Sequence, residues 1–127
     1  MHIYKNRWFA KFARREGIAD ARLREAIDRA NAGLIDADLG GGLVKQRVAR
    51  DGQGRSGGYR TIIIFRAEER AIFVFGFAKN DRANISAAEL AVLREAARLT
   101  LSFTLGDMEI EVESGKLIEV RYDDEDL

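Results

Sequence analysis

The sequence of 127 residues contains no cysteine and a single histidine, His2. The lack of cysteine excludes disulfides and thiolate metal sites and suits a reducing compartment. With only His2 available, a histidine-based metal centre is not expected either. No apolar run approaches the roughly 18 residues of a membrane span, and the start, MHIYKNRWF, lacks the apolar core of a signal peptide. We therefore expect a cytoplasmic protein.

The composition is that of a globular chain. Apolar residues make up 46% and charged residues 33%, which is too apolar for a disordered chain and too mixed for a fibrous one. The length is enough for one domain with one core. We find no repeat and no second domain, and we predict a single domain over residues 1–127, with 107–127 as an acidic C-terminal extension.

Charge is distributed unevenly along the chain although the formal net charge is zero. Nineteen of the 21 Lys and Arg residues precede residue 107, whereas nine of the 21 Asp and Glu residues lie in 107–127. A basic body followed by an acidic end is one sign of a protein that binds polyanions. Solubility charge that happens to segregate explains the same pattern equally well.

The first part of the chain predicts a short strand and two helices. The strand covers HIYK at residues 2–5, and NRWFAKFARREG forms a helix that ends at Gly17. We expect its core side to carry Trp8, Phe9, Phe12 and Ala13. The second helix begins with Asp20 as N-cap and stops at Gly33. The stretch LIDADLGGG that follows is expected to be extended or irregular.

Three strands and a third helix are predicted next. The strands are Leu43–Arg50, Tyr59–Arg66 and Arg70–Ala78, and their short connections predict an antiparallel meander. Ser86 and Glu89 form a capping box at the start of the helix SAAELAVLREAARLTL. Its side chains that face the sheet are Leu90, Leu93, Ala97 and Leu101. The element order predicts an α+β fold with helices against a small antiparallel sheet.

The acidic end of the chain allows two structures and two roles. MEIEVESGKLIEVRYD alternates as a hairpin would around Ser114–Gly115, yet its first half equally suits a helix. The preferred role is packing beside the last helix, through Ile110, Val112, Leu117, Ile118 and Val120. In the other role, the acids of residues 123–126 shield the basic body from RNA, which requires that they lie within a Debye length of about 8 Å of it.

A basic hairpin is the main candidate for a functional site. LVKQRVARDGQGRSGGYRTIIIF contains Lys45, Arg47, Arg50, Arg55 and Arg60, opposed only by an aspartate at position 51. Arginine forks bind phosphate oxygens bidentately, and the glycines let a loop backbone approach a ligand. The loop lacks the Gly-Lys-Ser/Thr ending of a phosphate-binding loop and precedes a strand, so a nucleotide cofactor is not expected. Edge-strand charges that resist aggregation remain the alternative.

Strand alternation predicts which of these cations share a face. Lys45 and Arg47 lie on one face of their strand, and Arg60 lies in line with Ile62 and Ile64. On the last strand, Phe73, Phe75 and Phe77 lead to Lys79. Lys45 and Arg47 cannot both lie opposite Arg60, but they can converge with it in a concave sheet if the strand registers allow.

Three segments of the chain, LGGGLVKQR, GRSGGYR and FGFAKN, together resemble the RelE/HigB group of bacterial type II toxins. The likeness spans residues 3 to 104. It implies a compact fold of helices on an antiparallel sheet, and the activity of a ribosome-dependent mRNA endonuclease. It also implies inhibition by an antitoxin, usually a helix-turn-helix protein. No metal and no cofactor are implied.

Carried over to this sequence, the catalytic positions of the family fall on Lys45, Arg47, Arg60 and Lys79. The implied reaction is attack of a ribose 2′-hydroxyl on the adjacent phosphate, which leaves a 2′,3′-cyclic phosphate. We further expect Arg50 and Arg55 to contribute to RNA or ribosome affinity. Better-known members place an aromatic residue soon after the last basic position, whereas here no aromatic residue follows Lys79 before Phe103.

Two other classes of function are compatible with the sequence. ParE-like relatives share the scaffold, act on DNA gyrase and do not need converging cations. A non-catalytic regulator that binds RNA or protein needs the basic patch but not its geometry. A short helix-turn-helix gene beside the coding sequence would favour the toxin.

Overall fold

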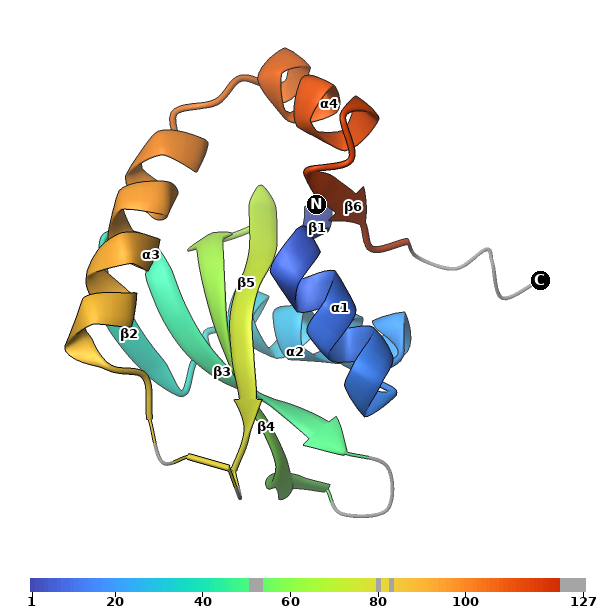
Figure 1. Ribbon diagram of the computed structural model, residues 1–127, viewed down its shortest axis with the longest axis vertical. Helices are drawn as coiled ribbons and strands as arrows, with labels where there is room; N and C mark the ends of the chain where they lie inside the picture. The colour runs from blue at the N-terminus through green and yellow to red at the C-terminus, as the bar shows by residue number, and fades with distance from the viewer. Residues whose placement is uncertain (51–53, 80, 83, 122–127) are drawn as a thin grey trace.

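The computed structural model describes residues 1–50, 54–79, 81–82 and 84–121, with the side chains of 54–56 excepted. In this part of the chain, helices surround a single sheet with strand order β2-β3-β4-β5-β1-β6 (Figure 1). In chain order the elements are β1 (His2–Asn6), α1 (Arg7–Glu16), α2 (Asp20–Asn31), β2 (Ala37–Gly40), β3 (Leu43–Arg50), β4 (Gly54–Arg66), β5 (Arg70–Ala78), α3 (Ala87–Thr100), α4 (Leu105–Glu113) and β6 (Leu117–Glu119).

The sheet is mostly antiparallel, as the element order predicts. β3, β4 and β5 form the expected meander, and β2 adds an antiparallel edge next to β3. β1 pairs in parallel with β5, and β6 pairs antiparallel with β1. The α+β fold is therefore confirmed, with one parallel pair that the strand spacing did not reveal.

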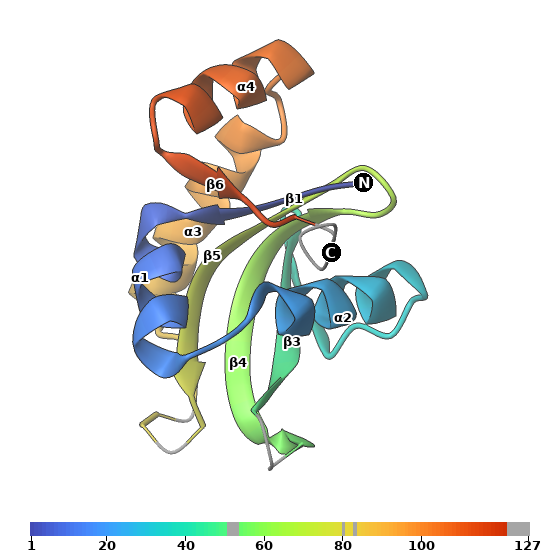
Figure 2. The ribbon, with the colours of Figure 1, turned by 90° about the vertical axis from the view of Figure 1, so that its right-hand side faces the viewer.

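One face of the sheet is closed by α1 and α2 (Figure 2). Phe9 and Phe12 of α1 pack on β5, where Phe9 lies 5.1 Å from Phe73 between ring centroids. Gly76 permits this contact, because a Cβ there would lie 2.9 Å from Cε2 of Phe12. Close packing at this position requires a residue without a side chain.

The other face carries a second core that α3 and α4 cover. Ala97 of α3 and Met108 of α4 are buried there, and the expected Leu90, Leu93 and Leu101 pack against it, as predicted. This core includes Leu43, Ile62 and Ile64 of β3 and β4, and it ends where the cations of the same strands begin.

The helix ends follow the sequence signals, with one correction. Asn6 caps α1, since its side chain accepts from the Phe9 N–H at 2.8 Å, and Gly17 ends the helix with φ of 72°. The Ser86–Glu89 capping box of α3 is confirmed. Asp20, however, is the first helical residue of α2 and not its N-cap, which is Ala19. The carboxylate still lies in the first turn, where the helix dipole favours it.

Three apolar side chains that were predicted to be packed are exposed: Trp8, Ile110 and Ile118. Trp8 is 44% exposed, and its ring stacks on Phe75 of β5 and does not belong to the buried core. At the acidic end, the chain forms α4 and then β6 and not a hairpin, so Ile110 points outward from the helix and is 61% exposed.

Leu117 and Val120 are buried as expected, and β6 is part of the sheet. Residues 107–121 are thus built into the fold. The acids of residues 123–126 lie outside the described residues.

Candidate functional site

Cations of β3 and β4 are nearest neighbours on the face that α3 covers. Arg47 lies directly opposite Arg60, and Arg60 lies opposite Phe77 of β5. One row further along the same face, Lys45 lies opposite Ile62. The face therefore changes from an apolar core under α3 to a cationic end, over a distance of two residues along each strand.

The Arg47–Arg60 pair lacks the usual compensation for like charges. Residues directly opposite each other on antiparallel strands have Cβ atoms only about 5 Å apart, and like charges there are destabilising. Arg47 is exposed, whereas Arg60 is half-buried, and its Nη1 is buried without a hydrogen-bond partner in the described structure. A buried guanidinium nitrogen without an acceptor is costly. An anion bound between the two arginines would remove both penalties.

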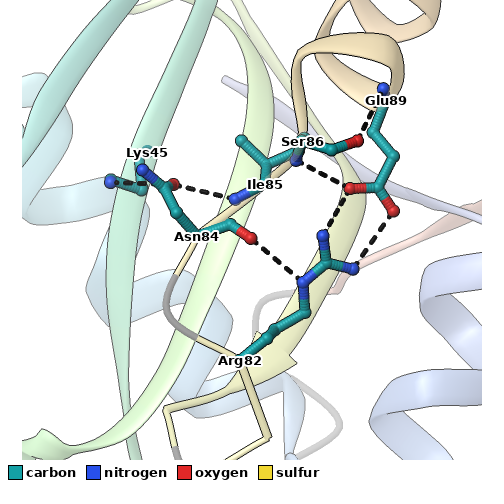
Figure 3. A network of polar contacts seen from close by, with 6 residues as sticks. All are labelled: Lys45, Arg82, Asn84, Ile85, Ser86 and Glu89. Carbon is teal, nitrogen blue, oxygen red and sulfur yellow. Dashed lines mark hydrogen bonds and ion pairs between the residues drawn. The ribbon is translucent and has the colours of Figure 1, made fainter.

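Lys45 is held by the segment that connects β5 to α3. Its Nζ donates to Oδ1 of Asn84 at 3.3 Å, and the same oxygen accepts from the Ile85 N–H at 2.8 Å (Figure 3). The segment therefore folds back over the sheet and reaches β3. Because Asn84 is neutral, this contact orients the ammonium group and leaves its charge uncompensated.

Arg82 is a further cation of this face that the sequence did not reveal. Its guanidinium lies 5.4 Å from the ring centroid of Phe77 and 5.7 Å from that of Phe75. It donates to both carboxylate oxygens of Glu89, at 3.1 and 2.6 Å, and its Nε donates to the Asn84 carbonyl at 3.0 Å (Figure 3). Arg82 is thus fixed against the aromatic floor beside Arg60.

Glu89 keeps its charge because of these contacts. Hydrogen bonds from the Arg82 guanidinium, and then from the Ser86 N–H, lower the pKa of Glu89 from 4.5 to about 2. The same carboxylate completes the capping box of α3. One carboxylate therefore links the start of α3 to the connecting segment, and through it to Lys45.

Lys79 follows directly after β5 and is exposed, and its backbone N–H donates to the Gly58 carbonyl at 3.5 Å. It comes two residues after Phe77, which is the partner of Arg60. The expected line from Phe73 to Lys79 is interrupted, because a register shift at Ile62/Ile63 turns Phe73 to the α1 side. Of the three phenylalanines in that line, Phe75 and Phe77 lie on the face of Arg60 and Phe73 does not.

Arg50 lies on the opposite face from the other cations. Its guanidinium is 5.7 Å from the ring centroid of Tyr59, a buried residue of the α1 and α2 core. Tyr59 donates to the Glu16 carbonyl and is buried, so its ring cannot stack on a ligand. The side chain of Arg55 lies outside the described residues.

The carboxylates of Glu89 and Asp36 contact residues of the cationic end, and both are engaged in hydrogen bonds within the protein. Asp36 accepts from the Arg47 N–H at 2.6 Å and is used in holding the start of β2 against β3. In the described part of the chain, no cluster of three or more His, Cys, Asp or Glu side chains could hold a metal ion. No described helix is long and apolar enough to cross a membrane. The arrangement is suited to binding and stabilising a phosphate.

Comparison with known families identifies the family of the chain but not its site residues. The chain matches the family model described as the RelE toxin of the RelE/RelB toxin–antitoxin system over residues 1–120. No curated protein matches the chain. Because the family match covers nearly the whole sequence, the chain belongs to the RelE toxin family. It is accordingly a toxin of a toxin–antitoxin system, for which an antitoxin partner is implied.

Proposed function

We propose that this toxin is a ribosome-dependent mRNA endonuclease whose catalytic cations are Lys45, Arg47, Arg60 and Lys79. The observation that supports this proposal most directly is the Arg47–Arg60 pair, with its buried Nη1 that lacks an acceptor. A scissile phosphate between the two guanidinium groups would provide that acceptor. Family membership supports a toxin, and the paired arginines support a phosphate as the group on which it acts.

The proposed reaction forms a bond between the ribose 2′-oxygen and phosphorus and breaks the bond to the 5′-oxygen of the next nucleotide. The products are a 2′,3′-cyclic phosphate and a free 5′-hydroxyl group. The phosphorane intermediate carries extra negative charge, and Arg47 and Arg60 would stabilise it from neighbouring strands. Fixed donors at the position where charge develops are the largest single contribution in many enzymes.

Proton transfer is the weaker part of this site. Ordinary lysines are protonated at neutral pH and act poorly as bases. We therefore assign Lys45 and Lys79 to charge stabilisation and to proton transfer: one of them takes the proton of the 2′-hydroxyl group, and the other protonates the leaving 5′-oxygen. Cleavage of free RNA should be slow, and the ribosome would accelerate it by holding the mRNA in a reactive geometry.

Arg50 and Arg55 belong to a different part of the proposal. Since Arg50 lies on the other face of the sheet, it cannot contact the same phosphate as Arg60. We propose that these two residues contribute to affinity for RNA or the ribosome and not to the chemical step. The antitoxin is proposed to be of the helix-turn-helix type.

The decisive experiment compares Arg60→Ala with Arg66→Ala. Both arginines lie on β4, but Arg66 is exposed and paired with Glu69 at the other end of the strand. Loss of Arg60 should slow cleavage about 10²–10³-fold, the usual cost of one transition-state donor, and abolish growth arrest. Cleavage is measured by primer extension on mRNA with purified ribosomes, and folding by thermal melting.

Three outcomes would contradict the proposal. Equal cleavage by both variants would remove Arg60 from the site. Intact transcripts together with loss of DNA supercoiling in arrested cells would indicate a ParE-like toxin that acts on gyrase. RNA binding without any cleavage on ribosomes would indicate a non-catalytic regulator.

A further inference from the structure

A pocket of about 380 Å³ lies between α4 and the β1–β6 edge of the sheet. Figure 2 shows α4 above these two strands. The described residues that line the pocket are three glutamates, two residues with aromatic rings and two aliphatic residues, and none of them belongs to the candidate site. A ligand in this pocket would therefore be separate from the phosphate proposed above.

The two strands supply an aromatic wall with a carboxylate beside it. His2 and Tyr4 are alternate residues of β1, so they lie on one face of the sheet, and their stacked rings are 6.4 Å apart between centroids. Glu119 of β6 lies directly opposite Tyr4 and therefore on the same face. The rings and the carboxylate line the same pocket.

The wall formed by α4 carries uncompensated negative charge. Glu109 and Glu113 are one turn apart on this helix, and both are exposed. Like charges at this spacing destabilise a helix, and carboxylates are unfavourable near a helix C-terminus. Neither glutamate has an ion-pair partner among the described residues, and the last turn of α4 contains no basic residue. Glu119 lies 3.9 Å from Nη2 of Arg121. A bound cation would reduce these penalties.

The hydroxyl group of Tyr4 is a second, independent sign of a ligand. Tyr4 is 4% exposed and lines the pocket, and its hydroxyl has no hydrogen-bond partner in the described structure. Burial, and then the carboxylate of Glu119, raise the pKa of Tyr4, so the hydroxyl is neutral. Arg70 acts on this pKa in the opposite direction, but it pairs with Glu69 at 3.1 Å. Because a buried polar group without a partner is costly, a ligand that donates to this hydroxyl would stabilise the pocket.

We infer that this pocket binds a linear aliphatic polyamine. The ammonium groups would lie near Glu109, Glu113 and Glu119, and one of them would donate to the Tyr4 hydroxyl. The methylene groups between them would pack on Val112 and over the aromatic rings. A metal ion fits less well, because among the described residues these carboxylates do not form a cluster that could hold one. The volume suits a small ligand. The inference does not depend on the nuclease proposal.

Isothermal titration calorimetry on the full chain, purified free of nucleic acid, tests the inference. The probes are putrescine and spermidine, Mg²⁺ as a dication without an apolar part, and a short capped peptide that contains two lysines. The chain should bind both polyamines at low salt. It should bind Mg²⁺ and the peptide at least about tenfold more weakly, because neither of them fills the pocket with methylene groups between its charges.

Matched variants locate the binding. Glu109→Gln should weaken spermidine binding about threefold or more. Glu111→Gln is the control, since Glu111 lies on the same helix but does not line the pocket, and it should leave binding unchanged. Tyr4→Phe should weaken spermidine binding about tenfold, the cost of a hydrogen bond to a charged group. It should not lower the melting temperature, because the hydroxyl has no described partner to lose. Thermal melting verifies that each variant is folded.

Several results would overturn the inference. Absence of polyamine binding at low salt would show that the pocket is not a site for this class of ligand. Equal binding of Mg²⁺ and putrescine, or equal effects of Glu109→Gln and Glu111→Gln, would reduce the observation to general charge attraction. Tighter binding of the lysine peptide than of the polyamines would make the pocket a docking surface for a basic protein segment. Full spermidine binding by folded Tyr4→Phe would remove the hydroxyl from the site.

Discussion

Both faces of the sheet are apolar at one end of the strands, but at the other end one face stays apolar and the other carries cations. On the α1 and α2 face, the row Val48–Tyr59–Ala78 is as buried as the row Val44–Ile63–Phe73 at the other end. On the α3 face, the row Leu43–Ile64–Ile72 is buried, whereas the row Arg47–Arg60–Phe77 carries two cations.

We expect this difference to separate stability from function within one sheet. Helices cover the first face over its whole length, so its residues can be exchanged only at the expense of packing. On the second face the helical cover ends before the last row, and charged side chains there are free to meet a ligand. Changes on the first face should thus affect folding, and changes at the open end of the second should affect activity.

The largest expected effect is on the covered face. Phe9→Ala removes a fully buried ring that contacts Phe12 and Phe73, and should lower the free energy of unfolding by about 3–5 kcal/mol. Trp8→Ala on the same helix is the comparison, and should cost less because Trp8 is 44% exposed. Urea denaturation measures both. Similar losses would contradict the assignment of Phe9 to the core.

A buried polar residue tests the same face with a smaller effect. Gln46 is fully buried and donates to the Ala26 and Leu34 carbonyls while accepting from the Asp36 N–H. Gln46→Leu leaves these groups unpaired and should cost about 1–3 kcal/mol. Cleavage per folded molecule should be unchanged. A loss of specific activity at full folding would show that the faces are not independent.

The Arg82–Glu89 contact predicts a pH effect on the second face. The pKa of Glu89 falls from 4.5 to about 2 on folding, so the ionised form is favoured in the native state. Its stabilisation is fully present above pH 4.5 and is lost as the pH falls towards 2. Acid titration of stability, followed by circular dichroism, should show this loss.

Glu89→Gln is the control for that titration. Glutamine can still complete the capping box with Ser86 but has no charge to lose. The variant should therefore show less dependence on pH in the same range. An unchanged titration would mean that Glu89 does not contribute.

The smallest effect concerns Arg50 and Arg55. If they contact RNA away from the reacting phosphate, neutralising both to Gln should flatten the salt dependence of RNA binding by about 0.7 for each phosphate that is no longer bound. The cleavage rate at saturating RNA should not change. Arg47→Gln is the comparison, and should lower both the salt slope and the rate. A slower rate in the Arg50 and Arg55 variant would place the loop in the chemical site.

Much of the fold was predictable because the signals were local. β3 and β5 have the predicted bounds, since each run of strand-forming residues is flanked in the sequence by glycine or by polar residues. α3 begins at the predicted capping box. For the first half of the acidic end, the sequence was equally compatible with strand and helix periodicity. The segment is helical in the structure, where Met108 of α4 packs into the second core.

The candidate site was only partly predictable. Alternation placed Lys45, Arg47 and Arg60 on one face, but the pairing of Arg47 with Arg60 depends on the register of two strands. A register shift within a strand also moved Phe73, and such shifts have no reliable sequence signal. Arg82 was missed because its position depends on a connecting segment that folds back through tertiary contacts with Glu89 and Phe77.

The pairing of β1 with β5 and β6 has a consequence for biosynthesis. The first strand finds its partners only after most of the chain has been made, because Lys5 pairs with Phe73 and with Ile118. At roughly 5–20 residues per second, a translating ribosome needs several seconds to produce those partners. During that time α1 has no completed sheet edge to pack on, and contacts so distant in sequence form slowly. If the toxin cleaves ribosome-bound mRNA, as proposed above, this late maturation would spare the ribosome that is producing it.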